Sequence, residues 1–305
     1  MRTRFVEVFF NQAGTSLDYS DYRGVYVLVE KIDRDEDRID VEELTPLSTD
    51  ITGGYIFAKD KPPADNPFTT TTTSAWGGQP LDIVEPKEPT GAQLEYLRTY
   101  MNGFESALSE PNFTDPSAGY AVYIDPQSFQ DWHLMAEFSR QTDAFQNSNY
   151  FRKRRGERVK ALPVWDFNLA FANNSEAPDG GSAQPGQGPS EGWHWIRLFD
   201  DWLSQKGPSH YPWFPPLFQD ENFRRRYWDR YWEKRRTILS PSAITARIDG
   251  LAAQVTGGLS TPVTNGTGSW PNSTPSVESP AGRHFARWQI LGSYVWTTPI
   301  GWADR

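Results

Sequence analysis

The sequence predicts an α+β protein, with strands gathered in the N-terminal part and helices in the C-terminal part. β-branched and aromatic runs fill the first part, and apolar residues at helical spacing fill the second. A hairpin-like pair of strands near residues 150–167 interrupts the helices. We therefore expect a single domain over residues 1–305, divided into a β-rich part (1–90) and a mainly helical part (91–305).

Three segments of the N-terminal part have the composition of strands. Residues 4–11 (RFVEVFFN) and 22–32 (YRGVYVLVEKI) are separated by a polar, glycine-containing link, which predicts a hairpin with a long loop. Residues 51–60 (ITGGYIFAKD) form a third candidate, whereas residues 61–90, rich in Pro, Thr and Gly, are expected to be irregular. Because the first strand follows almost at once after Met1, we expect further strands of the domain to lie upstream of it.

In the C-terminal part, predicted helices alternate with predicted loops. Residues 91–109 place apolar side chains on one stripe at helical spacing, and residues 125–141 begin with Asp125 as N-cap and Pro126 at the first helical position. Further helices are predicted at residues 192–205, 220–239 and 240–255. Segments rich in Gly, Ser and Pro are predicted to be surface loops, at residues 173–192 and 257–282.

The composition excludes some classes of function. A net charge of −9 over 305 residues argues against general nucleic-acid binding, which needs an excess of Lys and Arg. No apolar run reaches about 18 residues, so no membrane span is predicted in this chain, and the start MRTRFVEVFF lacks the pattern of a signal peptide. The 13 Trp, 13 Tyr and 18 Phe predict either a core built from rings or a stacking surface for sugars or bases.

One acid, Asp166, lies inside the otherwise apolar stretch LPVWDFNLAF at residues 162–171. A carboxylate in apolar surroundings is costly unless a positive or hydrogen-bonding group meets it. Asp166 therefore either caps a short helix that begins at Phe167, by accepting an amide proton two or three residues on, or holds a cation. The stretch by itself leaves both interpretations open.

A second acid, Asp143, follows the helix predicted to end near residue 141. The segment between Asp143 and Asp166 has the pattern of a hairpin with Gly156 in its turn, and the two ends of a hairpin can lie side by side. Two carboxylates at one edge suit phosphoryl transfer, in which one acid orients or deprotonates the attacking hydroxyl and the other binds a metal ion. The sequence contains no G-x-G-x-x-G, Walker or H-R-D motif.

The chain contains, in this order, VEVFFN, YRGVYVLVEKI, TGGYIF, a D-x-x-x-x-S pattern that begins at Asp143, PVWDFNLAF, DENFRRRYWDRYWEKRR and GRHFARWQILG. These stretches resemble the CotH family of atypical protein kinases, named for a spore-coat protein. The resemblance implies a kinase-like fold that uses ATP and a divalent cation, Mg²⁺ or Mn²⁺, to phosphorylate Ser or Thr of a protein substrate. It also implies a secreted, cell-surface or spore-coat location.

The same resemblance implies roles for the acids and for the turn that follows the first of them. Asp143 would be the catalytic acid and Asp166 the metal-binding acid. Ser148 and Asn149 lie near the position of a second metal ligand in kinases, and hydrogen bonding within a turn is the alternative role for this pair.

Nucleotide-binding residues are expected at strand ends. Glu30 and Lys31 end a strand that resembles the one running into the hinge of a kinase, whose backbone would meet adenine; a solvated ion pair is the alternative. Lys59 and Lys87 are the candidates for a phosphate-binding lysine, and the alternative for each is an exposed lysine on a strand end or loop.

The sequence also departs from the family. The usual Asp-Phe-Asp appears here with Asn168 in the third position, which removes one negative charge. This departure and the missing upstream strands keep a second hypothesis open, a kinase-like module without activity that binds a partner or a surface. A third hypothesis is a glycan-active protein, in which paired acids and a Trp-rich cleft serve sugar binding or hydrolysis.

Two other groups of charged residues have less specific interpretations. The basic run at residues 152–155, like those at both ends of residues 224–236, predicts either a solvated face or a surface that recruits an acidic substrate. The four histidines have no metal-binding spacing, so we interpret them as structural or surface residues.

Overall fold

The computed structural model describes residues 2–11, 14, 16–60, 64–71, 74–141, 144–145, 147–171 and 213–258. Contacts divide the chain into two compact units, Met1–Lys31 with Arg235–Arg305, and Ile32–Lys234. The second, larger unit contains the hairpin and the sheet that position the candidate site, and each unit is described by itself.

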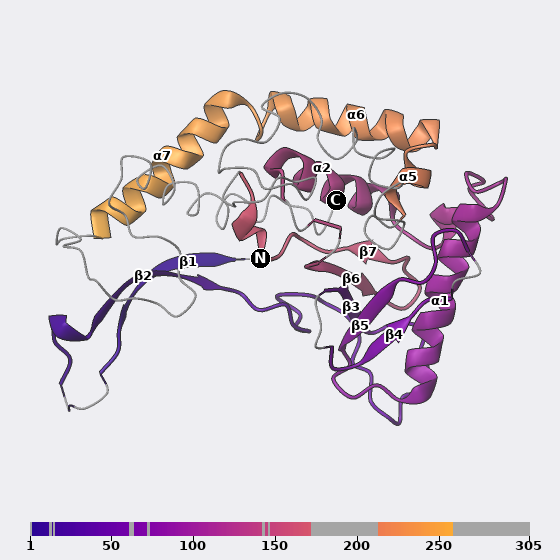
Figure 1. Cartoon of the computed structure of the whole chain (residues 1–305), viewed down its shortest axis with the longest axis horizontal. Helices are drawn as coiled ribbons and strands as arrows, with labels where there is room; N and C mark the ends of the chain where they lie inside the picture. The colour runs from indigo at the N-terminus through magenta and orange to yellow at the C-terminus, as the bar shows by residue number, and fades with distance from the viewer. Residues whose placement is uncertain are drawn as a thin grey trace. The chain divides into compact units, whose positions relative to one another are not determined.

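The larger unit contains a five-stranded sheet in the order β4-β5-β3-β6-β7, in which all neighbouring strands are antiparallel (Figure 1). Its strands are β3 (Tyr55–Lys59), β4 (Pro67–Thr69), β5 (Pro80–Glu85), β6 (Asn149–Lys153) and β7 (Lys160–Ala161). β3 is central, and all of its residues are buried. The irregular structure predicted for residues 61–90 is wrong at β4 and β5, because their prolines stand at strand starts, where no ladder donor is required.

The hairpin of β6 and β7 forms as the sequence predicts, with Gly156 at φ +67° in its turn. Its turn lies against the residues that precede β3, where the amide of Gly54 donates to the carbonyl of Lys153 at 2.8 Å. A Cβ atom on Gly53 would lie 2.0 Å from the backbone nitrogen of Arg155, so only glycine permits this approach. Since β6 also pairs with β3 along its whole length, the hairpin is fixed in the sheet.

The helices among the described residues of this part of the chain are α1 (Gly91–Ser109), α2 (Pro126–Ser139), α5 (Phe214–Leu217) and α6 (Glu221–Arg236). α1 begins with a capping box of Thr90 and Gln93, and the Asp125 side chain caps α2, as predicted. The helices predicted at residues 91–109, 125–141 and 220–239 are confirmed. α5 was not predicted, and the helix predicted at residues 192–205 lies outside the described residues.

The two faces of the sheet have different surroundings. Tyr55, Phe57 and Lys59 point to one face, because side chains alternate along a strand, and aromatic side chains of α1 and α2 pack over this face. Asp60 and Tyr150 belong to the opposite face, where their side chains are joined by a hydrogen bond of 3.0 Å. The end of β3 therefore sends neighbouring charged residues to opposite sides of the sheet.

Aromatic side chains build the core, and this confirms the first of the two interpretations of their abundance for the described residues. Phe104 and Trp213 meet edge to face with ring centroids 5.5 Å apart, a geometry that aromatic pairs prefer. The largest fully buried side chains include Tyr55, Phe57, Phe104, Phe129, Phe145, Trp213, Phe223 and Tyr227.

Buried polar contacts join α2 to α6. Arg230 donates to both carboxylate oxygens of Asp131, at 2.6 and 2.8 Å, and this bidentate geometry is a strong form of ion pair. The side-chain amide of Gln130 donates to the backbone carbonyl of Phe223 at 2.9 Å. These contacts orient α2, whose C-terminal end leads towards Asp143.

The smaller unit contains the predicted N-terminal hairpin, formed by β1 (Thr3–Phe9) and β2 (Tyr22–Val29), and the helix α7 (Pro241–Gly258). The loop predicted at residues 257–282 overlaps the last residues of α7, and its remainder lies outside the described residues, as does the loop predicted at residues 173–192. Among the described residues, no helix combines the length and apolar content that a membrane span requires.

The close approach at Gly53 predicts a large effect of a small substitution. Gly53→Ala should lower the free energy of unfolding by about 1–3 kcal/mol, because the added methyl group must displace the backbone of the hairpin turn. Urea unfolding measures this change. Gly91→Ala is the matched control, since a Cβ atom there meets nothing within 4 Å, and equal stability losses for both variants would contradict the close approach.

The burial of His133 predicts a pH dependence of stability. His133 is fully buried beside the Tyr227 hydroxyl, as a structural histidine, and burial lowers its pKa to about 3. Between about pH 6.5 and 3 only the unfolded chain binds a proton at this residue, so the free energy of unfolding falls by about 1.4 kcal/mol per pH unit as the pH decreases.

Unfolding at pH 7.5 and 5.5 tests this sign against a double variant, His133→Phe with Tyr227→Phe, which keeps two rings but has no titrating imidazole. The wild type should lose about 1 kcal/mol more than the variant over this interval. The same loss in both proteins would show that His133 does not contribute.

Candidate functional site

Asp166 occupies an unusual backbone conformation at the end of the hairpin segment. Its φ and ψ are 55° and 43°, in the left-handed region, and a short 3-10 turn, η3 (Phe167–Leu169), begins directly after it. The side chain makes no N-cap hydrogen bond to this turn, although the sequence allowed that interpretation. Asp166 is exposed, so the turn presents its carboxylate to solvent without using it as a cap.

The exit of α2 holds this turn. Arg140 ends the helix in a left-handed conformation, with φ 53°, and the next residue, Gln141, donates from Nε2 to the carbonyl of Asp166 at 3.0 Å. The amide of Phe171 donates to the carbonyl of Ser139 at 2.7 Å. The segment that leads to Asp143 is therefore bonded to both ends of the turn that carries Asp166.

Asp60 lies where β3 ends and β6 begins. It accepts hydrogen bonds from the amide of Ser148, at 3.2 Å, and from the hydroxyl of Tyr150, at 3.0 Å. Burial raises the pKa of Tyr150, and the charges of Asp60 and Asp166 raise it further, so both acids act on the same hydroxyl. Ser148 itself has a left-handed φ of 59°, which the bond to Asp60 helps to maintain.

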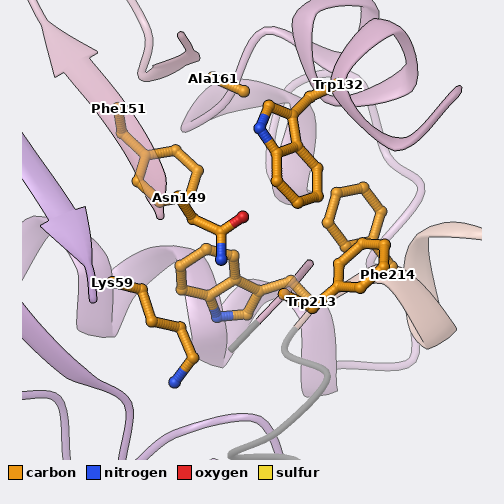
Figure 2. Close-up of a pocket in the computed structure, with 8 residues that line it drawn as sticks. Lys59, Trp132, Asn149, Phe151, Ala161, Trp213 and Phe214 are labelled. Atoms are coloured by element: carbon orange, nitrogen blue, oxygen red, sulfur yellow. The ribbon is translucent and has the colours of Figure 1, made fainter. Parts of the chain in front are cut away.

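Lys59 and Asn149 face the other side of the sheet and line a small pocket with aromatic walls. Figure 2 shows the Asn149 amide near the centre of this pocket, with Trp132 and Trp213 around it and the amine of Lys59 pointing away from the rings. Asn149 donates to the carbonyl of Asn147 at 3.1 Å, which is the turn hydrogen bond considered as its alternative role.

A buried polar cluster surrounds the amine of Lys59. Lys59 donates to Gln79 at 3.2 Å, and Trp213 donates from its ring nitrogen to Glu105 of α1 at 3.1 Å. Burial raises the pKa of Glu105 to about 7 and lowers that of Lys59 to about 8, while the attraction between the two opposes both shifts. Lys59 is only 3% exposed, so the alternative of a solvated lysine at a strand end is wrong, and its role towards phosphate stays a prediction.

Two of the other candidate nucleotide residues, Glu30 and Lys87, form ion pairs. Glu30 pairs with Arg2 at 2.6 Å, and its amide donates to the carbonyl of Arg2. Lys31 is exposed, and Lys87, at 55% exposure, lies 2.8 Å from Glu85. Glu30 thus forms an ion pair, with Arg2 as one partner, and Lys87 is an exposed lysine, as in the alternative interpretation of each residue.

The structure brings Asp60, Gln141, Ser148 and Asp166 to one region of the larger unit, whereas Asp143 lies outside the described residues. Sequence reasoning missed Asp60, Gln141 and Glu105. The positions of the first two gave weak signals. Asp60 directly follows the central strand, and Gln141 lies two residues before Asp143. Glu105 is an acid on the otherwise apolar stripe of α1, which is the same type of signal that singled out Asp166.

The basic run at the hairpin turn forms ion pairs within the larger unit. Arg154 lies 2.9 Å from Asp40, and Arg155 lies 3.5 Å from Asp50. Arg152 lies 3.7 Å from Glu157. These pairs favour a structural role for the three arginines over the recruitment of an acidic substrate, because each already has an acidic neighbour.

Tryptophans around the pocket belong to the core. Trp132 and Trp213 are 6% and 1% exposed, and they pack against other rings rather than forming an open aromatic cleft. In the parts of the chain that the structure describes, no group of three or more His, Cys, Asp or Glu side chains is arranged to hold a metal ion. A metal site built only from such side chains is therefore not found there.

Comparison with known families identifies the class of this protein. The family described as CotH kinase protein matches residues 1–286, nearly the whole chain. The chain therefore belongs to the CotH kinase family, as its sequence resemblance indicated, and its mixed α/β architecture with antiparallel sheets is consistent with this membership. No curated protein and no solved structure matches the chain.

The two hydrogen bonds of Asp60 predict a measurable change at Tyr150. In Asp60→Ala, the pKa of Tyr150 should fall towards its ordinary value while staying above it, because burial remains. Ultraviolet difference titration measures this shift. The free energy of unfolding should fall by about 1 kcal/mol more than in Tyr150→Phe, which keeps the acceptor of the Ser148 amide. An unchanged Tyr150 titration in Asp60→Ala would contradict this arrangement.

Proposed function

We propose that this protein transfers the γ-phosphoryl group of ATP to a Ser or Thr hydroxyl of a protein substrate. Membership of the CotH kinase family supports kinase-like function. The structural observation that carries the proposal is the turn at Asp166, which presents an exposed carboxylate at the end of a hairpin and does not use it as a helix cap.

Asp166 fits the role of a metal-binding acid. Mg²⁺ and Mn²⁺ prefer oxygen ligands, and an exposed carboxylate whose backbone is held from α2 is such a ligand. When bound, the cation would neutralise the negative charge of the nucleotide phosphates. Ser148 is hydrogen-bonded to Asp60 in the same region as Asp166 and could supply a second ligand. The Asn149 side chain faces the buried pocket and fits this role less well.

The reaction assigns separate roles to the protein's own residues. In the proposed step, Asp143 orients the substrate hydroxyl and accepts its proton. The hydroxyl oxygen forms a bond to the γ-phosphorus, while the bond from this phosphorus to the oxygen that bridges the β- and γ-phosphates breaks, and ADP leaves with that electron pair.

Substitution of the two acids separates binding from transfer. Asp166→Asn should weaken the metal-dependent affinity for ATP by about 100-fold or more, because the metal-binding charge is lost. The rate of phosphoryl transfer should fall with it. Asp143→Asn should remove transfer to a similar extent and leave ATP binding unchanged. The measurements are thermal shift with ATP and Mg²⁺ or Mn²⁺, and incorporation of radiolabelled γ-phosphate into protein.

The matched control is Asp229→Asn, an exposed acid on α6 that receives the same change of charge. Its binding and transfer should equal those of the wild type. ATP binding without labelled product in the wild type would favour the inactive kinase-like module, in which Asn168 replaces the usual third acid. Neither binding nor transfer in the wild type would overturn the proposal.

A further inference from the structure

The side chain of Gln141 is a buried link between two segments that the proposed reaction uses. Gln141 is 1% exposed and lies two residues before Asp143. Its Nε2 donates to the backbone carbonyl of Asp166 at 3.0 Å. A carbonyl oxygen only accepts hydrogen bonds, so this contact requires the NH₂ group of the Gln141 amide and determines which way the amide is oriented.

A second link joins the same two segments. The amide of Phe171 donates to the carbonyl of Ser139 at 2.7 Å, and the rings of Phe138 and Phe171 meet edge to face with centroids 5.9 Å apart. The links from Gln141 and Ser139 therefore reach the first and last residues of the turn between Asp166 and Phe171. Of the two hydrogen bonds, the one from Gln141 is donated by a side chain, so substitution can remove it without changing the backbone.

The conformation of Asp166 gives the Gln141 link its importance. A non-glycine residue in the left-handed region is disfavoured by contacts of its own Cβ atom, and surrounding structure must maintain it. Asp166 makes no side-chain cap that could do so. The backbone of Gln141 is also held, because its nitrogen donates to the carbonyl of Ala136 in the last turn of α2 at 3.2 Å.

We propose that Gln141 is a positioning residue that ties the segment leading to Asp143 to the backbone of Asp166, and so sets the direction of the Asp166 carboxylate. This inference rests on the proposed function for its consequence in catalysis, but the link itself does not depend on it. Gln141 does not touch the reacting atoms. It acts through Asp166, in the way that residues behind a metal ligand orient the ligand.

The other amide atom of Gln141 supports this role. Its Oε1 is buried and accepts no hydrogen bond from the residues that the structure describes. Among the described residues only Nε2 has a partner, and turning the amide over would place Oε1 against the carbonyl oxygen of Asp166. Its retention in this orientation is explained by the bond that Nε2 makes to Asp166.

The chain offers a matched control on the same helix system. Gln130 is also buried, at 3% exposure, and its Nε2 also donates to a backbone carbonyl, that of Phe223 in α6. Gln130→Met and Gln141→Met replace the same amide with an apolar chain of similar length and lose the same kind of bond. A structural loss should be similar in both variants, whereas loss of positioning should occur only in Gln141→Met.

Amide hydrogen exchange tests the link without any reference to activity. In Gln141→Met, exchange across residues 166–171 should become about tenfold faster, because the turn loses the hydrogen bond from the Gln141 side chain. In Gln130→Met, exchange of the same segment should equal that of the wild type. Unchanged exchange in Gln141→Met, or the same acceleration in both variants, would overturn the inference.

Metal and nucleotide binding test the consequence. Gln141→Met should weaken the affinity for Mn²⁺ with ATP, and lower kcat, by roughly 10- to 100-fold, with Gln130→Met close to the wild type. Gln141→Asn keeps the amide on a shorter side chain and should lose less than Gln141→Met in both exchange and affinity; equal losses would also overturn the inference. If the wild type neither binds ATP nor transfers phosphate, the proposed function fails, while the exchange comparison still decides whether Gln141 holds the turn.

Discussion

The candidate site depends on the pairing of β3 with β6. β3 is central in the sheet, and its residues are buried on both faces. In this pairing Tyr55 lies opposite Lys153 at one end and Lys59 lies opposite Asn149 at the other. The register of the hairpin against β3 is therefore fixed. Because side chains alternate with period two, this register decides which residues face the aromatic core and which face Asp60. A shift by one residue would turn Tyr150 towards the aromatic core and Asn149 towards Asp60.

The arrangement around Asp166 combines rigid and exposed parts. The core behind it is packed from aromatic rings, and the hairpin turn is held by a backbone approach that Gly53 alone permits. On this base, the Asp166 carboxylate is exposed while its backbone accepts a hydrogen bond from Gln141, just beyond the end of α2. Such a division suits a group that must meet a ligand in a fixed direction, since rigid support reduces the reorganisation needed on binding. The buried cluster of Lys59 and Glu105 lies on the other face of the sheet and has the opposite character, with charges that are shielded from solvent.

Sequence reasoning predicted the elements with strong local signals. The helices α1, α2, α6 and α7 were found from apolar spacing and capping residues, and the hairpin was found from its strand runs and Gly156. It failed for β4 and β5, whose short strands are stabilised by pairing in the sheet rather than by their own composition. For Asp166, it could not choose between a cap and an exposed carboxylate, because that choice depends on the backbone conformation of the folded turn.

By itself, the sequence determined the family, the N-terminal hairpin, the long helices of the described part and the two candidate acids, because these follow from residue types and their spacing along the chain. The tertiary structure decided the rest. It buried Lys59 and left Lys87 exposed, gave Asp60 its two hydrogen bonds, and brought Gln141 to the backbone of Asp166. The physical reason is that burial and hydrogen bonding are relations between distant segments, and local sequence carries no record of which segments meet when the chain folds.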